Sequence, residues 1–128
     1  MKKILIVIAD YYSDISKSLK NSAVKEFSKN KYSLKIIRVP GVFEIPVTIS
    51  KYIKKYDGFV VLGCVIKGQT PHFEFISRAT TEAIMTISHE NKKPIGYGII
   101  TCLNKKQAIA RGKKGKEAAE AVISILSQ

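Results

Sequence analysis

Apolar residues in this chain alternate between short continuous runs and longer segments with helical spacing. The runs at 4–9 (ILIVIA) and 59–66 (FVVLGCVI) are unbroken, which is typical of strands that are buried on both faces. Residues 14–30 repeat apolar positions every three or four residues and so predict an amphipathic helix. Two further strands are predicted at 32–39 and 95–101.

The same spacing predicts three more helices, at 43–56, 70–91 and 104–128. The first of these should turn five apolar side chains inward: Ile45, Val47, Ile49, Tyr52 and Ile53. Pro46 is compatible with this helix only in its first turn, because proline lacks an amide N–H. Glycines at both ends of 112–115 predict a break in the last helix.

Strands and helices therefore alternate through residues 1–128 with short links, which predicts one α/β domain with a parallel sheet between helices. Ligands of such sheets bind beyond the carboxyl ends of the strands. Those ends are predicted at 10–12, 40–44, 64–72 and 101–104.

The loop at 67–72 is the most suggestive of these ends. Thr70 and Pro71 are typical of a helix start, and Gly68 lets backbone amides approach a ligand, so the loop could hold a phosphate. His72 falls in the first helical turn, where the helix dipole favours a neutral ring that can accept a proton. The alternative is an ordinary capped helix with a surface histidine. His89 lies among polar residues at the other helix end and should be solvated.

Other strand ends carry residues that can bind ligands. Glu44 could accept hydrogen bonds from a polyol, or could simply favour a helix start. Tyr11 or Tyr12 could stack on a planar ring, or could pack at the rim. Arg111 could bind phosphate with two hydrogen bonds, or could be a solvated cation.

The charge and cysteine content narrow the function classes. The net charge is +12, but 19 of the 22 cations are lysines in singles and pairs, without a nucleic-acid stacking motif. A solvated lysine-rich surface is favoured, and no nucleic acid is expected as a partner.

The apolar start is too short for a signal peptide and no segment is long enough to span a membrane, so a cytoplasmic protein is expected. Cys64 and Cys102 lack metal-site spacing and are interpreted as buried or half-buried thiols, with no metal site.

Three separated motifs resemble the lumazine synthase family. They are VPGVFEIP at 39–46, LGCVIKGQTPHFEF at 62–75, and a spaced set within 98–111. The spaced set consists of Gly98, Thr101, Asn104, Gln107, Ala108 and Arg111. The resemblance implies a flavodoxin-like three-layer αβα sandwich with a four-stranded parallel sheet. It implies the penultimate step of riboflavin biosynthesis, catalysed by a transferase without metal or organic cofactor.

In that reaction 5-amino-6-(ribitylamino)uracil and 3,4-dihydroxy-2-butanone 4-phosphate, both small molecules, form 6,7-dimethyl-8-ribityllumazine with release of phosphate and water. By position, the resemblance implies that His72 moves protons. It implies that the pyrimidine ring and its ribityl chain are bound by Tyr11, Val42, Phe43, Glu44, Cys64, Val65 and Ile66, the last three through backbone groups. It implies that the phosphate is bound by Gly68, Gln69 and Thr70.

Family sites lie between neighbouring subunits of a homopentamer. The resemblance therefore implies that the neighbouring subunit supplies Tyr97, which contacts the pyrimidine ring, and Arg111, which contacts the phosphate. Lys114 is a further candidate. Tyr97 stands where phenylalanine is frequent. The RGKKG segment is short, and the chain begins at its first strand, so a free pentamer is expected instead of a capsid.

Competing interpretations remain at this stage. One is another phosphate-handling flavodoxin-like protein, although a receiver domain is disfavoured because the third strand ends without a phosphoacceptor aspartate. Others are a nucleic-acid-binding protein, and a relative that binds lumazine or flavin without making it.

Overall fold

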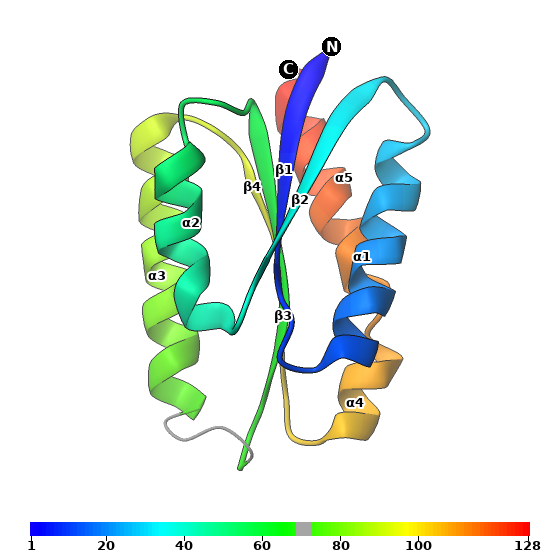
Figure 1. The fold of residues 1–128 in the computed structure, drawn as a ribbon, viewed down its shortest axis with the longest axis vertical. Coiled ribbons are helices and arrows are strands. Elements are labelled where there is room, and N and C mark those ends of the chain that lie inside the picture. The colour runs from blue at the N-terminus through cyan, green and yellow to red at the C-terminus, as the bar shows by residue number, and fades with distance from the viewer. Residues whose placement is uncertain (69–72) are drawn as a thin grey trace.

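The computed structural model describes residues 1–68 and 73–128. Its four strands form one parallel sheet in the order β2-β1-β3-β4 (Figure 1). The strands are β1 (Lys2–Ala9), β2 (Tyr32–Val39), β3 (Gly58–Ile66) and β4 (Ile95–Cys102). The predicted parallel sheet is therefore confirmed.

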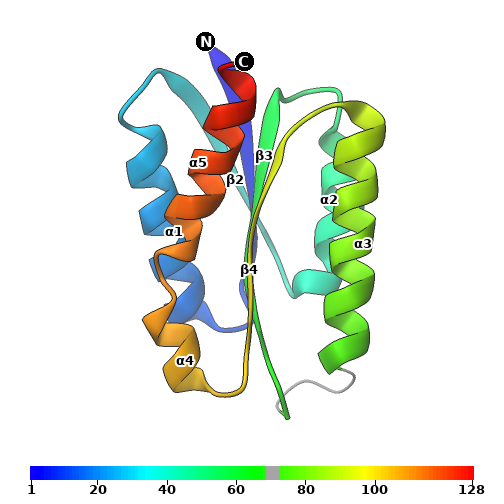
Figure 2. The same ribbon diagram turned by 180° about the vertical axis from the view of Figure 1, so that it is seen from behind.

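Helices cover both faces of the sheet, as Figures 1 and 2 show from opposite sides. The helices α2 (Ile45–Tyr52) and α3 (Phe73–Asn91) lie on one face. The other face carries α1 (Ser13–Phe27), α4 (Lys105–Ala110) and α5 (Lys114–Leu126). This three-layer arrangement is the flavodoxin-like architecture. In the described residues no helix has the length and apolarity that a membrane span needs.

The helix predicted at 43–56 differs from expectation in two ways. It opens with a 3-10 turn, η1 (Val42–Glu44), and the α-helix that follows ends at Tyr52. Pro46 does lie in the first turn of α2. Val47, predicted to face inward, is 68% exposed. At 100° per residue it lies on the side of α2 opposite Ile45 and Ile49, which are both fully buried.

The two central strands divide their side chains between two cores. From β1, Ile4, Ile6 and Ile8 face α1 and α5, whereas Leu5 and Val7 face α2 and α3. All five side chains have no solvent exposure. Strands covered on both faces need apolar residues at every position, which explains the continuous runs in the sequence.

Close approach between β4 and α5 depends on Gly96. A Cβ atom there would collide with the carbonyl oxygen of Ala118 and would lie 2.9 Å from Val122 Cγ2. Because the first contact is to backbone, it cannot be relieved by a rotamer change. The sequence thus places glycine on β4 where the helix backbone comes nearest.

Replacing Gly96 with alanine is expected to lower the free energy of unfolding by about 3 kcal/mol, because α5 must shift away from the sheet. Urea denaturation followed by circular dichroism measures the change. Gly41→Ala is the matched control, since its added Cβ would lie 3.4 Å from Glu44 Oε1, an ordinary contact. Equal stability of Gly96→Ala and the wild type would refute this packing argument.

Candidate functional site

The carboxyl ends of the strands lie at one end of the molecule, the lower end in Figure 1. There β3 reaches beyond its neighbour β1. The register of β3 with β1 ends at Leu62, whereas its register with β4 continues to Ile66. The last residues of β3 therefore turn one backbone edge toward the space beyond the end of β1.

The side chains at the end of β3 are buried, so only their backbone groups can meet a ligand. Cys64, Val65 and Ile66 are 6%, 2% and 1% exposed. Burial, together with the neighbouring Cys102 thiol, raises the pKa of Cys64 to about 12. At neutral pH this thiol keeps its proton and is a poor nucleophile. The prediction that both cysteines are buried or half-buried thiols is confirmed.

The loop after β3 lies partly outside the described residues. Gly68 is exposed and has a positive φ of 83°, a conformation that favours glycine. Gln69, Thr70 and His72, which carry the predicted phosphate and proton-transfer roles, lie outside the described residues. Helix α3 is described from Phe73 onward, directly after them.

The three residues of the η1 turn differ in burial. Val42 is buried, and a Cβ added at Gly63 would lie 3.0 Å from both Val42 Cγ1 and Ala9 Cβ. Phe43 is 66% exposed and Glu44 is half-buried. Packing of Val42 on the strand ends therefore fixes the turn that presents Phe43 and Glu44.

Phe43 and Glu44 line a groove of about 460 Å³ between α2 and α3. We call this the α2–α3 groove, and its walls include Pro46, Val47, Thr80 and Ala83. The exposed side chain of Val47 belongs to this groove, which is why the inward prediction for it was wrong.

Tyr11 lies at the end of β1 on the α1 side of the sheet. It is 67% exposed, and its ring meets the Tyr12 ring edge-on with centroids 4.8 Å apart. It lines a small groove with Asp14 and Lys105, whose charged groups are 3.9 Å apart. Tyr11 is thus accessible for stacking.

Tyr97 and Arg111 both lie along the outer edge of β4. With Thr101, Lys114 and Glu117 they line a groove of about 530 Å³, which we call the β4–α5 groove. Arg111 Nη1 donates a hydrogen bond to the carbonyl oxygen of Thr101, 3.2 Å away. The predicted phosphate residue and the uncertain candidate Lys114 therefore lie in one basic groove.

Asn104 and Gln107, part of the third motif, have a structural role. Asn104 caps α4 by accepting from the Gln107 amide at 2.9 Å, and Gln107 Oε1 accepts from the Leu103 amide at 2.9 Å. Ala108 is fully buried. Together these residues fix the start of the helix that leads to Arg111.

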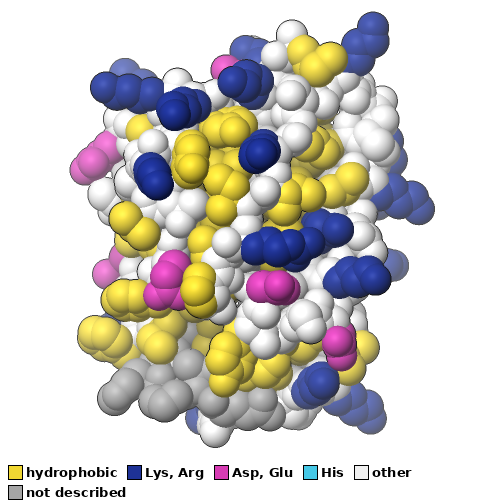
Figure 3. All heavy atoms as spheres, in the orientation of Figure 1, with side chains coloured by type: hydrophobic (Ala, Val, Ile, Leu, Met, Phe, Trp, Pro, Cys, Tyr) yellow, Lys and Arg dark blue, Asp and Glu magenta, His cyan; other side chains and the backbone are white. Residues whose placement is uncertain are grey.

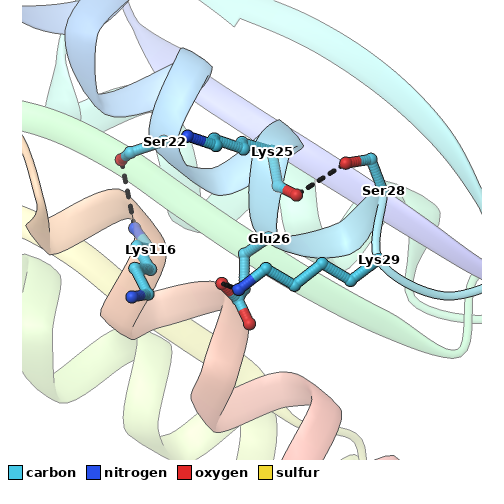
Figure 4. Close-up of polar contacts among 6 residues, drawn as sticks. All are labelled: Ser22, Lys25, Glu26, Ser28, Lys29 and Lys116. Carbon is cyan, nitrogen blue, oxygen red and sulfur yellow. Dashed lines mark hydrogen bonds and ion pairs between the residues drawn. The ribbon is translucent and has the colours of Figure 1, made fainter.

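Ser22 is a residue that the sequence gave no reason to single out. Its hydroxyl donates to the Gly112 carbonyl at 2.8 Å and accepts from the Lys116 amide at 3.1 Å, the contact drawn in Figure 4. A Cβ at Gly115 would collide with the Leu19 carbonyl oxygen. The break between α4 and α5 is thus held against α1, which positions the turn that carries Arg111 and Lys114.

Within one chain, the predicted site residues form separate groups. The α2–α3 groove with Phe43 and Glu44 shares no lining residue with the β4–α5 groove that holds Tyr97 and Arg111. The first is bounded by α3, and the second lies at the far edge of the sheet, on β4. Among the grooves of residues 1–68 and 73–128 described above, none therefore holds both groups.

The cations on the face in Figure 3 are scattered, with acidic and apolar side chains between them. On this face the lysine and arginine side chains do not form the continuous basic stripe that is typical of nucleic-acid binding.

Comparison with known proteins decides the family. The model of the 6,7-dimethyl-8-ribityllumazine synthase family matches residues 1–128. The chain belongs to the lumazine synthase family. A lumazine synthase of Bartonella bacilliformis is 41% identical, over 97% of this chain and 88% of its own. One of Nitrobacter hamburgensis is 40% identical, over 95% and 82%, and one of Cutibacterium acnes is 35% identical, over 98% and 80%.

All three motifs that suggested the resemblance lie inside the match to the lumazine synthase family. Two exposed residues of these motifs, Phe43 and Arg111, line separate grooves of the chain.

Proposed function

We propose that this chain condenses 5-amino-6-(ribitylamino)uracil with 3,4-dihydroxy-2-butanone 4-phosphate to form 6,7-dimethyl-8-ribityllumazine, phosphate and water. The observation that carries the proposal is the family match over residues 1–128, which includes every predicted site residue. The exposed side chains and open backbone edge at the carboxyl ends of the strands support it.

In this proposal the pyrimidine substrate lies over the end of β3. Tyr11 stacks on the ring, and the backbone edge of residues 64–66 meets its polar groups. Glu44 accepts hydrogen bonds from the ribityl hydroxyls, and Phe43 packs against that chain. The exposure of Tyr11, Phe43 and Gly68, and the burial of the side chains at 64–66, support these assignments.

The phosphate substrate is bound by backbone and side-chain donors of Gly68, Gln69 and Thr70, and by Arg111. His72 accepts and returns protons during imine formation, phosphate elimination and ring closure. These steps need a base with a pKa near neutrality beside the leaving group, and no metal or organic cofactor takes part in the proposed scheme. Holding both substrates in register supplies a large part of the rate.

The site is shared between subunits of a cytoplasmic homopentamer, with Tyr97 and Arg111 supplied by the neighbour and Lys114 as a further candidate beside Arg111. The separation of the α2–α3 groove from the β4–α5 groove supports this arrangement. A second copy would have to bring its β4 edge to the strand ends of the first.

The proposal is tested by an assay of lumazine formation combined with the mass of the protein in solution. Turnover by an oligomer of about five chains is expected. Tight flavin or lumazine binding without turnover would favour a purely binding protein, and an active monomer would refute the shared site.

A further inference from the structure

The hydroxyl groups of Tyr97 and Thr81 are hydrogen-bonded between β4 and α3. Their oxygen atoms lie 2.7 Å apart. Thr81 Oγ1 also lies 2.7 Å from the carbonyl oxygen of Ser77, one helical turn earlier. A carbonyl can only accept, so Thr81 donates its single proton to Ser77. The proton between Tyr97 and Thr81 must then belong to Tyr97.

This proton arrangement determines what Tyr97 can offer to a ligand. A phenol has one proton and lone pairs on its oxygen. Because the proton is directed to Thr81, the remaining capacity of the Tyr97 oxygen is as an acceptor. A phenylalanine at this position would offer neither the acceptor nor the hydrogen bond with Thr81 of α3.

The two residues also line one open groove, of about 780 Å³, between α3 and β4. We call it the α3–β4 groove; it includes Ser77, Arg78, Thr81, Tyr97, Ile99 and Thr101. Tyr97 lines the β4–α5 groove as well. The half-buried Tyr97 therefore lies at the edge of the sheet where the neighbouring subunit is proposed to complete the site.

We propose that Tyr97 determines ligand specificity by accepting a hydrogen bond from an N–H or O–H group of the bound pyrimidine substrate, and that Thr81 is its positioning residue. This inference rests on the proposed function, since the ring and ribityl chain of that substrate carry such donors. It goes beyond the ring contact, because it states the direction of the hydrogen bond and names the residue that sets it.

The ionisation of Tyr97 agrees with this role. Burial raises the pKa of Tyr97 above its ordinary value of 10.0, so the phenol keeps its proton at neutral pH. The hydrogen bond with Thr81 acts in the opposite direction and lowers the pKa, because once Tyr97 ionises the Thr81 hydroxyl can turn its proton from the Ser77 carbonyl to the phenolate. Glu74, Arg78 and Glu82 are the charged residues that line the same groove.

Tyr97→Phe is expected to raise KM for the pyrimidine about 3- to 10-fold, the range for one hydrogen bond. The kcat value and KM for the phosphate substrate should stay near those of the wild type. Thr81→Val should raise the pyrimidine KM by a smaller factor, and Thr81→Ser should restore it. Thr86→Val removes the same hydroxyl from an exposed position of α3 and is the matched control.

Ultraviolet titration supplies a second measurement that does not depend on turnover. The difference between wild type and Tyr97→Phe isolates the Tyr97 ionisation. Its pKa is expected to rise further in Thr81→Val and to return in Thr81→Ser. In an active enzyme, an unchanged pyrimidine KM in Tyr97→Phe, or an unchanged Tyr97 pKa in Thr81→Val, overturns this inference and leaves the proposed function intact. Absence of lumazine formation by the wild type overturns both.

Discussion

Replacing His72 with alanine is expected to slow lumazine formation by about 10²–10⁴-fold, the usual contribution of a positioned acid–base group. Substrate binding should survive, because the groups proposed to hold the ring and the phosphate remain. Steady-state rates at saturating substrate concentrations measure the first effect. Titration with the lumazine product, followed by its absorption or fluorescence, measures the second.

The expectation follows from where the histidine falls along the chain. It lies immediately before Phe73, the first described residue of α3. At a helix start the dipole disfavours the protonated imidazolium, whereas a bound phosphate favours it. In the proposed reaction we therefore expect this histidine to accept a proton while the phosphate substrate is bound and to return it later.

His89 provides the control, because it is the other histidine of the chain and is exposed in the last turn of α3. His89→Ala should leave both rate and binding unchanged. If His72→Ala keeps the wild-type rate, or if it loses ligand binding in proportion to rate, the proton-transfer role is wrong.

Mixing His72→Ala chains with Arg111→Ala chains is expected to restore activity that neither variant has alone. Each proposed site takes His72 from one subunit and Arg111 from its neighbour. In randomly mixed pentamers, about one quarter of the interfaces then join two intact halves. The activity after joint unfolding and refolding should approach about one quarter of the wild-type value.

The structure supports this experiment through the position of Arg111. Its guanidinium is held by the Thr101 carbonyl at the outer edge of β4, in a groove with no residue in common with the groove of Phe43 and Glu44. Arginine that binds phosphate through two hydrogen bonds is not replaced by a small side chain. Loss of activity in Arg111→Ala alone is therefore expected.

A mixture of His72→Ala and Glu44→Ala chains is the matched control. Both residues are proposed to lie in the same half of the site, so every half would carry one of the two changes. No activity should return in that mixture. Recovery there, or absence of recovery with Arg111→Ala, would contradict a site built from two subunits.

The sequence alone determined the layers and the strands of this protein. Every residue of β3 is buried, so its apolar run had to be continuous, and this signal located the strand to within one residue. A break near 112–115 was also predictable; it lies at 111–113, and Gly115 is the second residue of α5. Gly115 lies against the Leu19 carbonyl, where no side chain fits, and a glycine in a helical pattern indicates such a position. The strand ends, and thus the candidate residues on them, followed directly.

Only the tertiary structure decided which residues meet. Apolar periodicity reports how deeply a residue is buried along its own element, but not which element covers it. Val47 looked like a core residue, yet it lines a groove because the core is already filled by Ile45 and Ile49. Thr81 is sixteen residues before Tyr97, and their hydrogen bond exists only because α3 packs beside β4. Likewise, Ser22 holds the turn after Arg111 through contacts that no spacing in the sequence could reveal.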